Sequence, residues 1–281
     1  MSVSTPISFE FFPPRNEEQA LILRSTWQKL ALLKPRYLTV TFGAGGSAQE
    51  ATSATVRDLI QLTDVPVAAH ISCMAPAREV LDQLLDRYRR KGVRRLVVLR
   101  GDLPAESAFK PVFRYASDLV AYVHERHEDW FRVEVGCYPE IHPESRDMDA
   151  EIRWFRHKVD AGARGAITQY FFEPETYFEF VERCRDAGIT IPIVPGIMPI
   201  TNYTQLARFS ARCGASLPPW LEQRLQGFGD DGASLRAYGL DVISALCEQL
   251  LAGGAPGLHF YTLNRANATM KIWQRIQQAQ A

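Results

Sequence analysis

Short apolar runs alternate along the whole chain with longer segments whose apolar residues have helical spacing. Most runs are apolar on both faces, which a parallel sheet covered by helices requires. In the segments between them apolar residues recur three and four positions apart, as Tyr177, Phe180, Val181 and Cys184 do. The predicted strands are Ile7–Phe11, Tyr37–Thr41, Val67–Ile71, Arg95–Leu99, Val133–Cys137, Gly165–Thr168, Ile191–Val194 and Gly257–Tyr261.

Eight strand-then-helix units predict an α/β fold, a (β/α)8 TIM barrel forming a single domain over residues 1–281. A doubly wound sheet is the alternative, but it usually has fewer units and a phosphate-binding G-x-G-x-x-G motif. The nearest stretch, Gly43-Ala44-Gly45-Gly46, has a different spacing, and the sequence has no P-loop. The stretch Ser216–Gly232 is expected to be an excursion before the last pair of helices.

Charge and composition exclude several classes of protein. The chain has 32 Lys+Arg and 32 Asp+Glu and no net charge, so it lacks the basic footprint of a nucleic-acid-binding protein. The N-terminus has neither a basic segment nor an apolar core, so we expect no signal peptide. The most apolar stretch, Ile189–Ile200, is too short for a membrane span and contains three prolines.

The five cysteines are odd in number and widely spaced, and they include no Cys-x-x-Cys pair. This pattern indicates reduced thiols in a cytoplasmic protein and predicts no metal site. Each is expected to be a small buried apolar residue rather than a nucleophile.

Glu10 is the first candidate for chemistry, because functional residues of this fold lie at the C-terminal ends of the strands. Strand alternation places Phe9 and Phe11 on one face and Glu10 on the other, so Glu10 points into the barrel mouth if the phenylalanines face the helices. A carboxyl group there is poorly hydrated and suited to act as a general acid. The alternative is a structural ion pair.

Polar residues follow six further strands, and each has a plain alternative. Thr41 and the glycines after it suit either a ligand or an ordinary turn, and His70 is either a catalyst or a core histidine. Arg100 and Asp102 are either a surface pair or two charges offered to a ligand. Together with Tyr138, His142, Gln169, Asn264 (an expected helix N-cap) and Arg265, they predict a large site for flat polar ligands.

Several longer motifs occur in one collinear order over nearly the whole chain, and at these motifs the sequence closely resembles the bacterial methylenetetrahydrofolate reductase family. They are Phe9–Arg15 (FEFFPPR), Arg100-Gly101-Asp102, Tyr115–Leu119 (YASDL), Tyr138–Pro143 (YPEIHP), Lys158–Ala163 (KVDAGA), Ile167-Thr168-Gln169, Pro195–Ile200 (PGIMPI) and His259–Arg265 (HFYTLNR).

The resemblance implies a barrel flavoprotein that reduces 5,10-methylenetetrahydrofolate to 5-methyltetrahydrofolate and so supplies methyl groups for methionine synthesis. FAD would carry hydride from NADH or NADPH in a ping-pong sequence, and a homo-oligomer is expected. Glu10 is implied as the general acid, and Asp102 as a catalytic residue near flavin and pterin.

The resemblance also implies two sets of binding residues. The folate or nicotinamide would contact Gln169, Gln205, Phe209 and Arg265. The implied FAD-binding residues are Thr41, Phe42, Ala44, His70, Arg100, Gly101, Asp102, Tyr115, Ala116, Tyr138, His142 and Lys158.

The sequence departs from the family pattern at a few of these positions. Gly45-Gly46 replaces Asn-Ser, Phe42 replaces tyrosine, and Trp154 and His157 stand where Asn and Arg are expected near the FAD phosphates or adenosine. Losing the fixed charge of an arginine affects FAD affinity rather than the reaction. The chain stops just after the barrel, so the regulatory domain of the eukaryotic enzymes, and inhibition by S-adenosylmethionine, are not expected.

Two other functions are open from the sequence. A pterin-dependent methyl transferase without flavin is disfavoured because the chain has no cobalamin or zinc-thiolate motif. A non-catalytic homologue is disfavoured because Glu10, Asp102 and Gln169 are all present.

Overall fold

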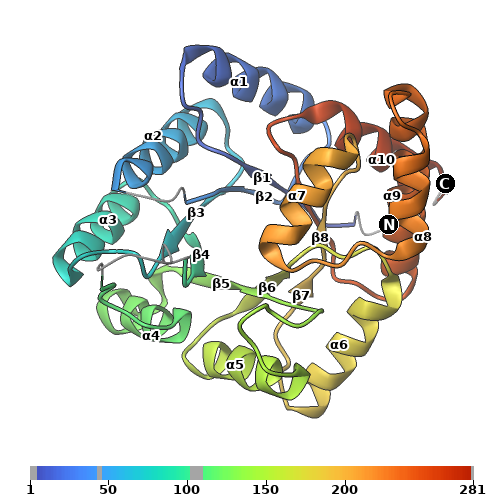
Figure 1. Ribbon diagram of the computed structural model, residues 1–281. Coiled ribbons are helices and arrows are strands. Elements are labelled where there is room, and N and C mark those ends of the chain that lie inside the picture. The colour runs from blue at the N-terminus through green and yellow to red at the C-terminus, as the bar shows by residue number, and fades with distance from the viewer. Residues whose placement is uncertain (1–4, 43–45, 102–109, 280–281) are drawn as a thin grey trace.

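A nearly closed parallel sheet forms the centre of the molecule (Figure 1). The computed structural model describes residues 5–42, 46–101 and 110–279. Every strand pair in this part of the chain is parallel. The strands are β1 (Ile7–Phe11), β2 (Tyr37–Val40), β3 (Val67–Ser72), β4 (Arg95–Leu99), β5 (Arg132–Cys137), β6 (Gly165–Thr168), β7 (Ile193–Val194), β8 (Gly196–Ile197) and β9 (Leu258–Tyr261).

The seventh predicted strand, Ile191–Val194, corresponds to β7, and a further short strand, β8, follows Pro195 at the other end of the strand order. The strand order is β7-β6-β5-β4-β3-β2-β1-β9-β8, and Pro195 alone separates its two ends. Proline has no N–H to donate to a neighbouring strand, so the ladder is interrupted there. At Gly196, an added Cβ would collide with the Thr168 carbonyl oxygen and lie 2.7 Å from the Tyr261 hydroxyl. The barrel prediction is confirmed, with β8 as an additional short strand.

The helices ring the sheet on its outside (Figure 1). They are α1 (Glu17–Ala31), α2 (Gly46–Leu62), α3 (Arg78–Arg90), α4 (Ala116–His127), the short 3-10 helix η1 (Glu128–Trp130), α5 (Met148–Asp160), α6 (Pro174–Asp186), α7 (Tyr203–Cys213), α8 (Pro219–Gly227), α9 (Gly232–Ala252) and α10 (Ala266–Ala279). None of the helices in the described ranges is both long and apolar enough to cross a bilayer.

Two helices are additional to the outer ring after the seventh strand. The expected excursion at Ser216–Gly232 is largely the helix α8. In Figure 1, α7 lies inside the ring of outer helices, over β8. Helix α9 packs against α10 and α6 and takes the outer position of the seventh unit. The fold therefore places α7, with Gln205 and Phe209, near the end of the barrel.

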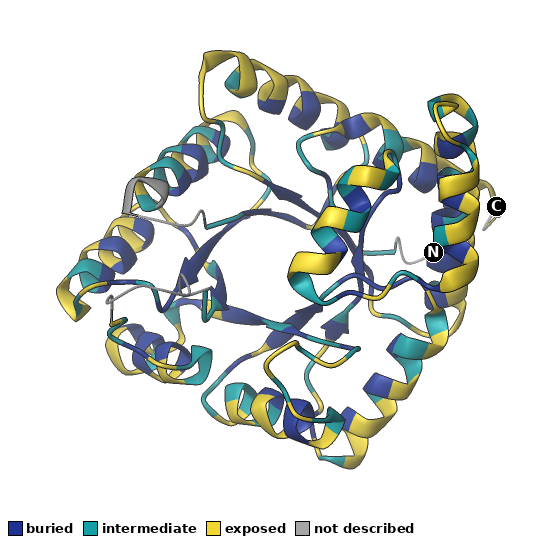
Figure 2. Ribbon diagram, in the orientation of Figure 1, coloured by how far each residue is buried: buried dark blue, intermediate teal, exposed yellow. Residues whose placement is uncertain are grey.

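The core has an outer apolar layer and a mixed interior. Phe9 and Phe11 face the helices and are fully buried, as are the facing residues of the other strands (Figure 2). Inside the barrel, Tyr37, Ala68, Val97 and Ile167 form a separate small cluster. The interior also contains buried polar side chains, namely Ser8, Glu10, Thr39, His70, Glu134 and His259. These buried polar residues include the candidates for a catalytic role.

Candidate active site

Glu10 lies inside the barrel, where strand alternation predicts it. It pairs in register with Thr39 of β2 and Tyr261 of β9, and its neighbours Phe9 and Phe11 point outward. Only 8% of Glu10 is exposed. Its Oε2 atom is 3.5 Å from Nε2 of His70 and 3.7 Å from Nε2 of His259. A single carboxyl group is thus held between two imidazoles.

The two imidazoles differ in their partners. His259 shares a 2.8 Å hydrogen bond between its Nδ1 and the hydroxyl of Ser8. The Nε2 atoms of both histidines are buried and have no hydrogen-bond partner among the described residues. Burial lowers the pKa of His70 to about 4, although Glu10 opposes the shift. His70 is therefore uncharged near pH 7, and its contact with Glu10 is not an ion pair at that pH.

His259 also belongs to the site, although the sequence analysis assigned it no role beyond its place in the HFYTLNR motif. It follows the same alternation in β9 as Glu10 follows in β1, and Ser8 stands opposite it in register. That shared inward face is the signal that identifies it.

The end of β9 is tied firmly to the end of β1. The Asn264 side chain accepts a hydrogen bond from the Phe12 N–H and donates one to the Phe12 carbonyl, both at 2.9 Å. Thr262 Oγ1 donates to the Glu10 carbonyl at 2.5 Å. The prediction of Asn264 as a helix N-cap is wrong, because its amide is used to join two loops. The segment after β9 therefore holds a fixed position relative to Glu10.

Two of the predicted substrate residues come together at this end of the barrel. Gln205 and Arg265 both line a cavity of about 470 Å³, together with Asn202, Thr204 and Arg208. Asn202 caps α7 by accepting from the Gln205 N–H at 2.7 Å, so the first turn of the helix is fixed.

The other two predicted substrate residues lie apart from that cavity lining. Phe209 is half-buried one turn further along α7, with the Arg208 guanidinium 6.0 Å from its ring centre. Gln169 is half-buried after β6, where its Oε1 accepts from the Tyr170 N–H at 3.1 Å.

After β2 and β4, both backbone groups and side chains occupy the predicted FAD-binding positions. Thr41 and Phe42 are half-buried, and Thr52 Oγ1 donates to the Thr41 carbonyl at 2.8 Å. Gly101 has φ +79°, and an added Cβ there would lie 2.7 Å from Met74 Cγ, so this position requires glycine. Two predicted residues, Ala44 and Asp102, lie outside the described residues.

Arg100 makes a bidentate pair that the sequence reasoning did not foresee. Its guanidinium donates to both oxygens of Glu144, at 2.6 and 2.5 Å. Arg100 holds the pKa of the Glu144 carboxyl below its usual range. His142 lies in the same loop, where its Nδ1 accepts from the Glu144 N–H and its ring meets Tyr138 edge-on at 4.6 Å.

An aromatic cluster joins α4 to α5 at the positions where the sequence departs from its family. The Tyr115 ring stacks on Trp154 with centres 5.1 Å apart, and Trp154 meets His157 edge-on at 5.4 Å. Ala116 begins α4 next to this cluster. One residue further on, Lys158 donates to the Gly136 carbonyl at 2.6 Å, and desolvation lowers the pKa of its ammonium group. Trp154 thus packs against both His157 and Tyr115, and Tyr115 is one of the predicted FAD-binding residues.

Comparisons with a family model and with individual proteins identify the same family. The model of the family described as methylenetetrahydrofolate reductase matches residues 2–277. The 5,10-methylenetetrahydrofolate reductases of Escherichia coli (strain K12) and Pectobacterium carotovorum are each 37% identical over 266 residues, which cover 95% of this chain and 88% of each relative. Methylenetetrahydrofolate reductase (NADH) 1 of Arabidopsis thaliana is 34% identical over 97% of this chain, which spans 48% of that relative.

A solved structure supports the fold independently. A Clostridium thermocellum protein, described as binding two copies of 5-methyl-5,6,7,8-tetrahydrofolic acid, aligns with a TM-score of 0.63 at 18% identity. The alignment covers 98% of this chain and 95% of that protein. With the barrel, the inward Glu10 and the collinear sequence match taken together, the chain belongs to the methylenetetrahydrofolate reductase family.

Proposed function

We propose that the chain reduces 5,10-methylenetetrahydrofolate to 5-methyltetrahydrofolate, with NADH or NADPH as electron donor and FAD as the hydride carrier of a ping-pong sequence. The observation that carries this proposal is the buried Glu10 carboxyl, 3.5 Å from an uncharged His70, in a chain of this family. A proton donor inside the barrel end is what the opening of the substrate's imidazolidine ring requires.

Glu10 acts as the general acid in this proposal. It donates a proton to a nitrogen of the imidazolidine ring, the C–N bond opens, and the methylene carbon becomes an electrophilic iminium. His70 and His259 hold the Glu10 carboxyl in place from two sides, and the Ser8 hydrogen bond orients His259. Gln205 and Arg265 bind the part of the folate that extends toward the 470 Å³ cavity. Asp102 is proposed to assist near the pterin.

The residues at the ends of β2 to β5 fit a flavin dinucleotide. Gly101 follows β4 with a positive φ that turns the chain there, and the buried Nε2 of His70 has no hydrogen-bond partner among the described residues. Tyr138 and Tyr115 are aromatic rings at this end, Tyr115 being stacked on Trp154. Lys158 and Arg100, which pairs with Glu144, are cations of the kind that bind a diphosphate. Bound FAD, once reduced by NADH or NADPH, would supply the hydride that reduces the methylene carbon.

The remaining proposals concern the setting of the reaction. We propose a cytoplasmic location, since Cys73, Cys137, Cys184, Cys213 and Cys247 are all free thiols. We also propose a homo-oligomer, which the family resemblance implies. The Arabidopsis relative carries NADH in its name, so NADH is the donor to test first.

Initial-rate kinetics test the proposed function. We expect parallel double-reciprocal lines when NADH is varied at several concentrations of methylenetetrahydrofolate, with 5-methyltetrahydrofolate as the product. Converging lines would contradict the ping-pong sequence, and absence of the methyl product would contradict the reaction.

A further inference from the structure

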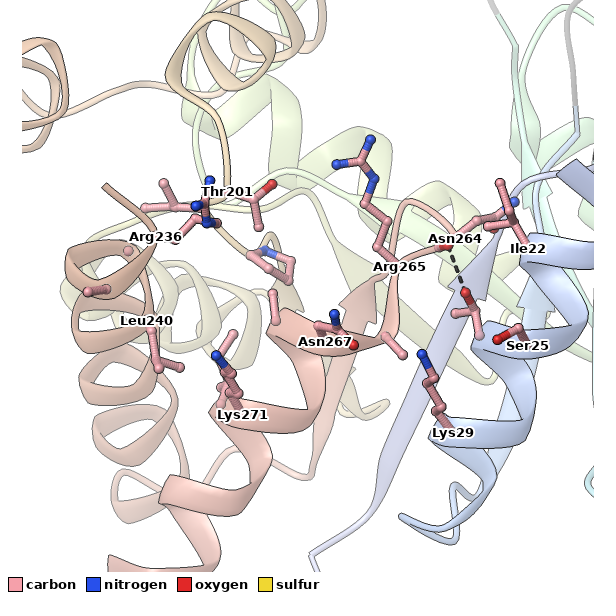
Figure 3. Close-up of a pocket in the computed structure, with 18 of the residues that line it drawn as sticks. Ile22, Ser25, Lys29, Thr201, Arg236, Leu240, Asn264, Arg265, Asn267 and Lys271 are labelled. Atoms are coloured by element: carbon pink, nitrogen blue, oxygen red, sulfur yellow. Dashed lines mark hydrogen bonds between the residues drawn. The ribbon is translucent and has the colours of Figure 1, made fainter. Parts of the chain in front are cut away.

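A groove of about 930 Å³ runs along the outside of the barrel between α1, α9 and α10 (Figure 3). We call it the α1/α9/α10 groove. Lys29 of α1, Lys271 of α10 and Arg236 of α9 line it, and Arg265 stands at its end beside Asn264 (Figure 3). The lining does not include Glu10, and Arg265 is its one residue that the proposed function uses.

The charge lining the groove has one sign. Five cations line it, namely Lys29, Arg236, Arg265, Lys271 and Arg275, and its lining contains no Asp or Glu. Arg275 pairs with Asp241, whereas the other four are in no ion pair with any described residue. The whole chain has no net charge, so this is a local concentration of positive charge. Such a groove attracts an anionic ligand.

The shape of the groove favours an extended ligand. Asn267, Lys271 and Arg275 are spaced four residues apart and form one row along α10. From Ala266 to Arg275 this helix rises about 14 Å. On the α9 side, Ala233 and Ala237 leave room between the helices. A single small anion would use only one part of this length, whereas a chain of carboxylates could use all of it.

Arg265 connects the groove to the proposed folate site. It lines both the groove and the 470 Å³ cavity that contains Gln205 and Arg208. The Asn264 bonds to Phe12 hold this connecting segment in place. Because Arg265 belongs to both linings, the cavity and the groove adjoin at this side chain. This adjacency points to an extension of the substrate itself.

We propose that the α1/α9/α10 groove binds the oligo-γ-glutamyl tail of the folate. The inference rests on the proposed function, since it takes folate as the ligand of the adjoining cavity. Arg265 receives the part of the tail nearest the cavity, and Lys29, Lys271 and Arg236 pair with the carboxylates of later glutamyl residues.

Kinetics with folates of two tail lengths test this proposal. KM and kcat are measured with the mono- and pentaglutamate forms of methylenetetrahydrofolate for wild type and for Lys29→Ala/Lys271→Ala. We expect a lower KM for the pentaglutamate in wild type. The variant should raise that KM by roughly threefold to tenfold, since each exposed ion pair contributes modestly, and leave monoglutamate kinetics unchanged. The control Arg90→Ala/Lys91→Ala removes two exposed cations from the C-terminal end of α3 and should match wild type.

Equal KM values for the two tail lengths, or a pentaglutamate preference that survives in the groove variant, would overturn the proposal. If neither folate is reduced, the proposed function fails, and the groove is then tested by calorimetry with free γ-linked pentaglutamate. Binding that the groove variant loses supports the groove site, and no binding overturns it. Tighter binding of the α-linked peptide would identify a site for acidic protein segments and would also overturn it.

Discussion

Nε2 of His70 lies 3.5 Å from Oε2 of Glu10, and both side chains are almost completely buried in the barrel interior. Because the pKa of His70 is about 4, the imidazole is neutral when the enzyme works near pH 7. The carboxyl group therefore meets a neutral neighbour rather than a fixed cation. A neutral His70 supports the proposal that Glu10 is a proton donor rather than a member of an ion pair with that histidine.

Replacing Glu10 by Gln removes the proton donor and keeps the shape of the side chain. Reduction of methylenetetrahydrofolate should fall by about 10²–10⁴-fold, the usual contribution of a general acid. Oxidation of NADH with an artificial electron acceptor should remain, since that half-reaction needs no proton from Glu10. If both half-reactions kept their wild-type rates, Glu10 would have no role as the acid.

The buried His70 makes the stability of the protein depend on pH. Its pKa falls from 6.5 to about 4 on folding, so the unfolded chain binds more protons between these values. The free energy of unfolding should therefore decrease as the pH falls through this window, by about 2 kcal/mol between pH 7.5 and pH 5. Urea denaturation at both pH values measures the loss. It should shrink by about that amount in His70→Asn, and a variant with the full wild-type loss would contradict the assignment.

Gly196 is required in the short strand β8. An alanine there would place its Cβ against the Thr168 carbonyl and the Tyr261 ring, so Gly196→Ala should destabilise the protein by about 1–3 kcal/mol. Gly227→Ala is the matched control, because a Cβ at Gly227 meets no atom within 4 Å. Thermal denaturation should show a lower Tm for the first variant and an unchanged or higher Tm for the second. Equal Tm values for the two variants would contradict the packing argument.

The aromatic cluster of Tyr115, Trp154 and His157 predicts an effect on the cofactor. His157→Arg restores a fixed positive charge at the position where the family pattern has arginine, so it should tighten FAD binding by up to about fivefold. The Kd for FAD is measured by quenching of flavin fluorescence. His157→Gln, which adds no charge, is the control. An unchanged Kd in the arginine variant would place the diphosphate away from α5.

Local sequence patterns predict much of this fold. The two-sided apolar runs predict the strands to within two residues at either end, because burial on both faces leaves a strong signal in each run. The inward position of Glu10 follows from strand alternation alone. The short strand β8 escaped prediction, because the predicted seventh strand ended at Val194, before the proline that interrupts the ladder.

Contacts between residues that are far apart in the sequence could not be predicted from local sequence patterns. His259 and Ser8 are 251 positions apart and become neighbours only because β9 pairs with β1. The α1/α9/α10 groove likewise depends on how three distant helices pack. In the sequence its cations are ordinary charged residues. Only the packing of the helices that carry them brings them into the lining of one groove.

The visible absorption spectrum of the purified protein tests the central claim most directly, before and after anaerobic addition of NADH. The account predicts a flavin band near ~450 nm that NADH bleaches and methylenetetrahydrofolate restores. A colourless protein that also fails to take up added FAD would contradict the flavin-dependent reaction.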